Sequence, residues 1–129
     1  MPINASMSIF NKYTDPVTKA VTFKKHLIKN VFWDDSKGVN LNHGYDKADS
    51  VNVYVPKSIN DLSGYVESKK YNGSGWTIAE GDYIIRGDTD QSEVIGIKDL
   101  SNYEVFIITV VDDKDFGSKD LHHFEIKGR

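Results

Sequence analysis

The sequence contains no cysteine, which excludes a disulfide framework, a thiolate metal site and a cysteine nucleophile. No run of residues approaches the roughly 20 apolar positions that a membrane-spanning helix needs, and we expect no membrane association. The amino terminus lacks a basic segment followed by an apolar one, so we also expect no secretory signal. These absences fit a protein made in a reducing cytoplasm.

Positive charge is not concentrated anywhere along the chain. The formal net charge is −3 and the lysines are scattered. Proteins that hold nucleic acid through its phosphates usually carry a basic stripe, because counterion release supplies most of the non-specific affinity. We therefore expect no tight binding of DNA or RNA. An acidic surface instead suits a protein that lines a passage for DNA, because like charges repel and the DNA does not adhere.

What the chain does have is a repeated alternation of apolar and polar residues. Val51, Val53 and Val55 alternate with Asn52 and Tyr54, a two-residue period that is typical of a strand with one face in a core. A chain of 129 residues with 39% hydrophobic content has room for one core, so we expect residues 1–129 to form one domain. We predict an all-β fold: a small β-barrel or sandwich of about seven to nine mostly antiparallel strands with one long loop.

Several further segments share β-favouring composition and are bounded by turn residues. We expect residues 76–78 and 94–97 to flank residues 83–86 as hairpin partners, and residues 112–119 to form a polar hairpin loop. The run at residues 103–111 is apolar on both alternating sets, which is typical of a strand buried on both faces. We therefore expect Ile107→Asp to unfold the protein, because an unpaired buried charge is costly. The other predicted strands are residues 7–13, 19–24, 26–33, 39–42, 51–55 and 121–127.

The longest stretch without a clear period is residues 57–75. Irregular segments longer than about 12 to 15 residues are uncommon in compact domains and are usually functional or disordered. We therefore expect partner contacts here and expect the domain to fold without this loop; the alternative is a surface insertion with no role. Tyrosine and tryptophan are enriched in interfaces, and the same rings could form a platform for a sugar. The candidate interface residues are Lys57, Tyr65, Lys69, Lys70, Tyr71 and Trp76.

Motifs that would carry chemistry are weak. His122 and His123 are adjacent in a predicted strand, so they point to opposite faces and cannot share one metal ion. The acidic run at residues 112–117 does not have calcium-loop spacing. The Arg-Gly-Asp tripeptide at residues 86–88 is expected by chance and suits a turn. No nucleophile elbow or phosphate-binding glycine loop is present. We expect no enzymatic activity, no cofactor and no metal.

An ordered set of segments resembles a family of small proteins of formally unknown function that tailed bacteriophages and prophages encode. The resemblance spans nearly the whole chain and rests on residues 9–13 (IFNKY), 31–33 (VFW), 48–56 (ADSVNVYVP), 76–87 (WTIAEGDYIIRG), 99–103 (DLSNY), 117–118 (GS) and 121–126 (LHHFEI). The layout is similar to that of head-closure, or stopper, proteins of long-tailed phages. Those are small β-barrels that form a ring below the portal and adaptor, retain packaged DNA and give the tail a docking surface.

The resemblance implies a virion structural protein at the head–tail junction, made in the cytoplasm of the bacterial host. Its partners would be portal or adaptor proteins, tail proteins and further copies of itself in a ring, with a monomer expected for the isolated chain. Packaged DNA would pass nearby without sequence-specific binding. Residues 57–75 would correspond to the long loop that projects toward the channel in stopper proteins. Two alternatives stay open: a tail-completion or tail-adaptor protein of the same virion, and a carbohydrate-binding β module.

Overall fold

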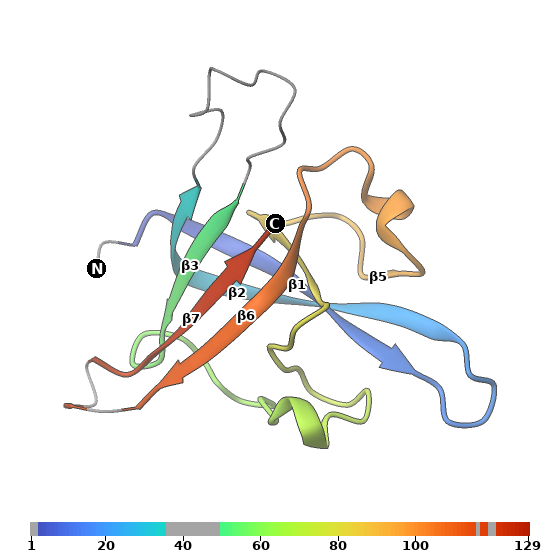
Figure 1. The fold of residues 1–129 in the computed structure, drawn as a ribbon, viewed down its shortest axis with the longest axis horizontal. Coiled ribbons are helices and arrows are strands. Elements are labelled where there is room, and N and C mark those ends of the chain that lie inside the picture. The colour runs from blue at the N-terminus through green and yellow to red at the C-terminus, as the bar shows by residue number, and fades with distance from the viewer. Residues whose placement is uncertain (1–2, 36–49, 116, 119–120) are drawn as a thin grey trace.

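The computed structural model describes residues 3–35, 50–115, 117–118 and 121–129, and this part of the chain is built from β-strands (Figure 1). Seven strands form one antiparallel sheet, which confirms the all-β prediction, and within the described residues two short 3-10 helices lie between them. In chain order the elements are β1 (Ala5–Thr14), β2 (Val21–Asp35), β3 (Val51–Pro56), η2 (Ser68–Lys70), β4 (Tyr83–Arg86), β5 (Glu93–Val94), η3 (Ile97–Leu100), β6 (Phe106–Lys114) and β7 (His123–Gly128).

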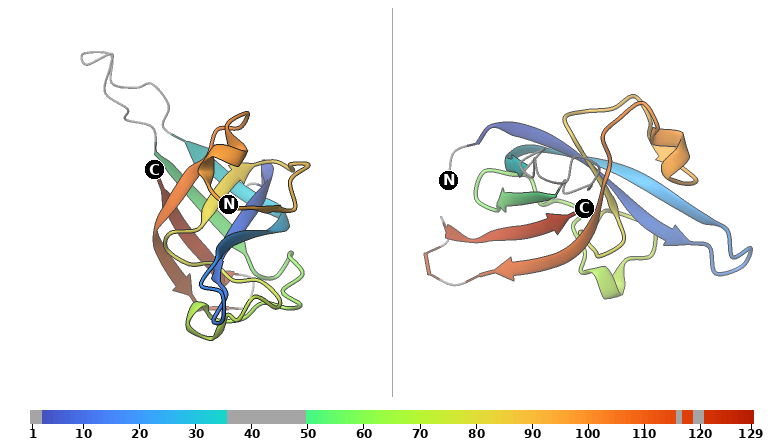
Figure 2. Two further views of the ribbon diagram at one scale, coloured as in Figure 1. Left: turned by 90° about the vertical axis from the view of Figure 1, so that its right-hand side faces the viewer. Right: turned by 45° about the horizontal axis from the view of Figure 1, so that its top comes forward.

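The sheet curves round and closes partly into a ring (Figures 1 and 2). The strand order is β1-β4-β6-β7-β3-β2-β5, and β1 also pairs with β2. Closure depends on the length of β2, which pairs with β1 through its first part and with β3 through Phe32 to Asp35. The register shifts once between β1 and β2, where β2 has the extra residue, and once between β6 and β7, where β6 has it; such bulges bend a strand.

The β1–β2 hairpin has a turn that its own sequence specifies. The carboxylate of Asp15 accepts hydrogen bonds from the backbone nitrogens of Val17 at 2.8 Å and Thr18 at 3.1 Å. Pro16, which lies between Asp15 and Val17, has a fixed φ that suits the turn. Lys19 adopts φ +64° and completes the reversal. The hairpin extends beyond the rest of the sheet, and its tip lies at one end of the long axis of the molecule (Figure 1).

Two clusters of buried side chains fill the inside of the sheet. The larger one contains Val53, Trp76, Ile108 and Phe124 among others, and the smaller one is built round Phe10. The alternation in β3 is confirmed, because Val51, Val53 and Val55 are buried and the residues between them are half-buried. None of the helices in the described part of the chain is long and apolar enough to cross a membrane.

Several predicted strands differ from those observed. Residues 19–24 and 26–33 belong to one continuous strand, β2. Residues 76–78 do not form a strand paired with β4, since Trp76 makes only an isolated parallel bridge to Tyr65. The two-residue strand β5 pairs with β2 and not with β4, so the predicted hairpin with residues 94–97 is wrong. Residues 39–42 lie outside the described residues.

Strand β6 is less buried than its sequence indicates. It begins at Phe106 and continues through Asp112 to Lys114, which the sequence predicts to be part of a loop. Phe106 and Ile108 are buried, but Ile107 is 39% exposed and Val110 is also exposed. The prediction of a strand buried on both faces is therefore wrong, because only one face of β6 meets the core. The expected unfolding by Ile107→Asp loses its basis.

Candidate functional site

Residues 57–75 lie against the sheet and are not a detached loop. Leu62 and Tyr65 pack on the larger core cluster. The amide of Trp76 donates to the carbonyl of Gly64 at 2.9 Å, and the amide of Val66 donates to the carbonyl of Trp76 at 2.9 Å. This close approach requires glycine at position 75, where φ is +77° and a Cβ would lie 2.2 Å from the oxygen of Gly64. Deleting the segment would uncover the core, so we no longer expect the domain to fold without it.

Trp76 closes one side of the larger core cluster. Its side chain is 3% exposed, its ring stacks on His26 with centroids 4.2 Å apart, and Tyr65 meets it edge-on at 5.1 Å. The indole Nε1 donates to the carbonyl of Ser63 at 2.9 Å. Burial lowers the pKa of His26. Trp76 therefore acts as a packing residue and leaves almost no surface for a partner.

Lys57 is bound to carboxylates of its own chain. Its Nζ lies 2.5 Å from carboxylate oxygens of both Asp113 and Asp115 and 4.5 Å from the ring centroid of Phe124. Burial disfavours the charged amine, but the hydrogen bonds to the two aspartates outweigh it and raise the pKa of Lys57. The side chain is 16% exposed, so it joins the start of residues 57–75 to the end of β6.

Among the remaining candidates, only the two lysines of η2 are freely exposed. Lys69 and Lys70 lie on the surface of this helix. Tyr71 follows them and meets Tyr13 of the hairpin edge-on, with centroids 6.4 Å apart. Its hydroxyl is buried without a hydrogen-bond partner among the described residues, and burial raises the pKa of Tyr71. The structure thus brings Lys57, Tyr65, Tyr71 and Trp76 into internal contacts and leaves Lys69 and Lys70 for an external one.

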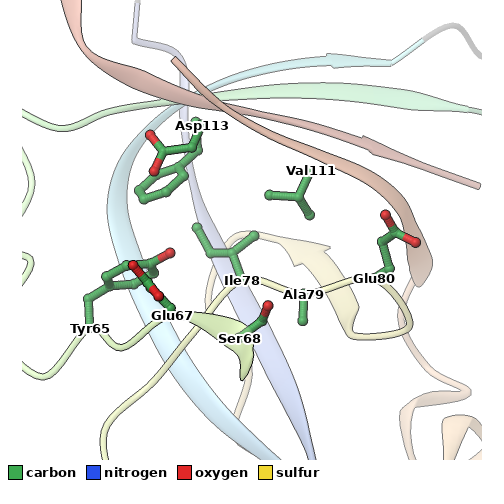
Figure 3. Close-up of a pocket in the computed structure, with 9 residues that line it drawn as sticks. Tyr65, Glu67, Ser68, Ile78, Ala79, Glu80, Val111 and Asp113 are labelled. Carbon is green, nitrogen blue, oxygen red and sulfur yellow. The ribbon is translucent and has the colours of Figure 1, made fainter. Parts of the chain in front are cut away.

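Sequence reasoning missed a groove of about 500 Å³ beside the C-terminal half of β6 (Figure 3). We call it the β6 groove. Ile78, Val111 and Phe124 are its apolar lining. Its charged lining residues are all acidic: Glu67, Glu80 and Asp113. Figure 3 shows Ile78 and Val111 between Glu67 on one side and Glu80 on the other.

A buried polar network holds residues 77–82 beside this groove. The carboxylate of Asp82 accepts from the backbone nitrogens of Lys12 at 3.0 Å and Ala79 at 3.1 Å and from Asn11 Nδ2 at 2.8 Å. Asn11 also exchanges hydrogen bonds with the backbone of Thr77. Burial raises the pKa of Asp82 to about 6, and these hydrogen bonds oppose the shift. Asp82 therefore anchors the groove wall to β1, whereas its sequence context indicated only a turn.

The described residues contain no group of three or more histidine, aspartate or glutamate side chains that could hold a metal ion. His122 lies 3.5 Å from Asp115, and His123 lies 3.6 Å from Glu125. These are separate pairs, and His122 lies just before β7, which begins at His123. What the described residues offer is therefore a set of surfaces: the β6 groove, the exposed η2 and the projecting hairpin.

No curated protein and no solved structure matches the chain. A family model covers residues 2–129, which is nearly the full length of the chain. The description of that family assigns no function and names no phage component. On this match, the chain belongs to a family of unknown function, DUF6751.

Proposed function

We propose that the chain is a structural protein of a phage virion, a head-closure or neck-connector subunit at the head–tail junction. In this role copies form a ring that retains packaged DNA and docks the tail. The observation that carries the proposal is the arrangement of surfaces on a partly closed β ring, with the hairpin and η2 exposed outside it. The resemblance in the sequence supplies the virion setting, and fold alone would not supply it.

The physical properties of the chain support this role. A ring subunit needs a stiff body and different contacts on its two sides, because heterologous contacts close into rings. The two core clusters supply the stiff body. The net charge of −3 suits a wall beside DNA, since a polyanion does not adhere to it. The exposed Lys69 and Lys70 offer a local positive site for a partner protein.

The direct test is to follow the chain in particles of the phage that encodes it. We expect mass spectrometry and immunogold labelling to find it at the junction of mature particles and on DNA-filled tailless heads. Loss of the gene should give heads that leak DNA or cannot join tails. Normal infectious particles without the chain would refute the proposal. Co-purification with free tails instead of heads would assign the tail-completion or tail-adaptor role.

A charge-reversal experiment narrows the contact surface. Lys69→Glu with Lys70→Glu should reduce the yield of infectious particles while the protein stays folded. Lys98→Glu is the matched control, because Lys98 is an exposed lysine of the other 3-10 helix, η3. Equal yields from the two variants would remove η2 from the proposed contact.

The carbohydrate-binding alternative loses support from the placement of its aromatic rings. A sugar platform needs exposed ring faces, but Trp76 is buried and stacked on His26. Tyr65 packs edge-on against Trp76 and also contacts Phe124. Tyr71 has a buried hydroxyl. Glycan-array binding by the folded wild-type protein would be needed to revive this alternative.

A further inference from the structure

Among the described strands, β6 has two partners at its start and only one at its end. Phe106 and Ile107 pair with β4, and residues 108–114 pair with β7. On the side away from β7, the last hydrogen bonds link Ile108 to the backbone of Gly81 and Asp82. Beyond Ile108 the β6 groove begins, so this edge is open to an added strand. Open edges are sites where a second chain can pair unless charge or cover prevents it.

The β6 groove carries negative charge that its own chain does not balance. Asp113 forms an ion pair with Lys57, but Glu67 and Glu80 make no ion pair with any described residue. Between them lies the apolar lining of Ile78 and Val111. An occupant that fits this groove is therefore a projecting segment with an exposed apolar side chain and a nearby lysine.

The tip of the β1–β2 hairpin has these properties. Val17 at the turn is 86% exposed. Lys19, two residues further on, is exposed and makes no ion pair with a described residue. Lys24 and Lys25 are used within the chain, because Lys24 lies over the Tyr13 ring and Lys25 pairs with Asp88. The free positive charge of the hairpin is thus at its tip.

The hairpin cannot fill the groove of its own chain. Its tip lies at one end of the long axis, and the C-terminal end of β6 lies toward the other end, as Figure 1 and the right panel of Figure 2 show. Strand pairing fixes both in place. A contact between them must therefore join two molecules.

We propose that the β6 groove receives the hairpin tip of a second copy of the chain, so that copies join head to tail; this rests on the proposed role as a ring subunit. Val17 packs on the half-buried Val111, and Lys19 faces Glu80. Each copy then has one groove filled and one hairpin still available. Such a contact continues from copy to copy until the rotation between subunits closes a ring.

Disulfide trapping tests this contact cleanly, because the natural sequence has no cysteine. The variant carrying Val17→Cys and Ser68→Cys places one thiol at the hairpin tip and one on an exposed residue that lines the groove. We expect mild oxidation of the concentrated protein to give a ladder of dimers, trimers and larger species on a non-reducing gel. A head-to-tail contact continues past the dimer, whereas a symmetric contact between the same sites stops there.

The control moves one thiol to a site of similar accessibility. Ile95 is 76% exposed and belongs to neither the hairpin nor the groove, so the variant carrying Ile95→Cys and Ser68→Cys should give no ladder. Charge reversal provides a second readout: in the trapping variant, Lys19→Glu alone and Glu80→Lys alone should each weaken the ladder, and the two together should restore it. High salt should also weaken it, because the screening length falls to about 3 Å at 1 M.

Three results would overturn the inference: no ladder, a ladder no stronger than the control, or products that end at the dimer. Failure of the inference differs from failure of the proposed function. A chain located at the head–tail junction that gives no specific ladder keeps its role and loses this contact. A specific ladder from a chain absent from virions keeps the contact and loses the role.

Discussion

Residues 57–75 and strand β6 are neighbours that contribute to the fold in opposite ways. The segment at residues 57–75 contains only one three-residue 3-10 helix, yet Leu62 and Tyr65 pack on the larger core cluster. Strand β6 is a continuous strand of nine residues, yet most of them are exposed or half-buried. Regular backbone and burial are therefore separate properties, since one follows from hydrogen bonding and the other from which face meets the core.

The irregular segment is held by specific polar contacts in place of a strand ladder. The side chain of Asn60 donates to the carbonyls of Asn30 at 2.8 Å and Pro56 at 2.7 Å, and it accepts from the amide of Asn30 at 3.1 Å. Backbone groups that lack ladder partners must find other ones, because a buried unpaired group is costly. Four predictions test how far the two regions differ.

The largest difference is expected between neighbouring residues of β6. Ile108 is 1% exposed and Ile107 is 39% exposed. Ile108→Asp should abolish folding, since burying an unpaired charge costs free energy comparable to a total stability of about 5–15 kcal/mol. Ile107→Asp should lower the free energy of unfolding by about 1 kcal/mol or less. Amide NMR dispersion and thermal melting measure both, and unfolding by both variants would contradict the one-sided burial of β6.

Removing the main anchor of residues 57–75 should also be strongly destabilising. Trp76→Ala should lower the free energy of unfolding by about 3–5 kcal/mol, as expected for a large core aromatic. Trp76→Phe is the matched control: it keeps a ring next to His26 and loses the hydrogen bond to Ser63, so its cost should be smaller. Urea denaturation followed by circular dichroism gives both values. A loss below about 1 kcal/mol for Trp76→Ala would show that this segment is not part of the core.

The Asp82 anchor should make stability depend on pH. Burial raises its pKa from 3.8 to about 6, so the folded state binds this proton more tightly than the unfolded state does. The contribution of protonated Asp82 to the free energy of unfolding is therefore fully present below about pH 4 and is lost as the pH rises through about 6. The loss is up to about 3 kcal/mol, at 1.36 kcal/mol per pKa unit.

Asp82→Asn is the control because it cannot titrate. Its amide also places a donor where the carboxylate accepts N–H groups, which should cost about 1–3 kcal/mol. The unfolding free energy of the wild type minus that of the variant, measured from pH 3 to 8, should fall through the window given above. A difference that rises with pH would show that the N–H donors from Lys12, Ala79 and Asn11 keep the carboxylate ionised.

The smallest effects are expected for the lysines of residues 57–75. Lys57→Ala should cost about 1 kcal/mol, because this lysine balances Asp113 and Asp115 at a partly exposed site. Lys69→Ala and Lys70→Ala should change the free energy of unfolding by no more than about 0.5 kcal/mol. Chemical denaturation at low salt separates these values. Equal costs for all three would mean that η2 contributes to the fold as much as Lys57 does.

Much of the strand content could be predicted because its signals are local. The period of β3, the turn at Asp15 and Pro16, and the alternation around Phe124 and Ile126 each act within a few residues. The errors arose where pairing was decided at a distance. Trp76 resembles the start of a strand, but its backbone bonds to Gly64 and Val66, and the pairing of β5 with β2 joins residues far apart in the sequence.

The candidate site was predicted only in part for the same reason. Exposed Lys69 and Lys70 stand in a polar stretch and could be identified from it. The β6 groove could not be identified, because Glu67, Glu80 and Asp113 become neighbours only when β6 passes residues 65–80. Asp82 likewise looked like a turn residue, and only folding brings Asn11 to it.

By itself the sequence determined that the chain would be built from strands with one apolar face. Successive side chains of a strand point to opposite faces, so the local order of apolar and polar residues defines those faces. Tertiary structure alone decided which apolar residues are inside. Ile107 and Val110 are as hydrophobic as Ile108 but lie on the face of β6 that no other described strand covers. Burial depends on what a face meets after the sheet has curved, and the composition of one strand carries no information about that.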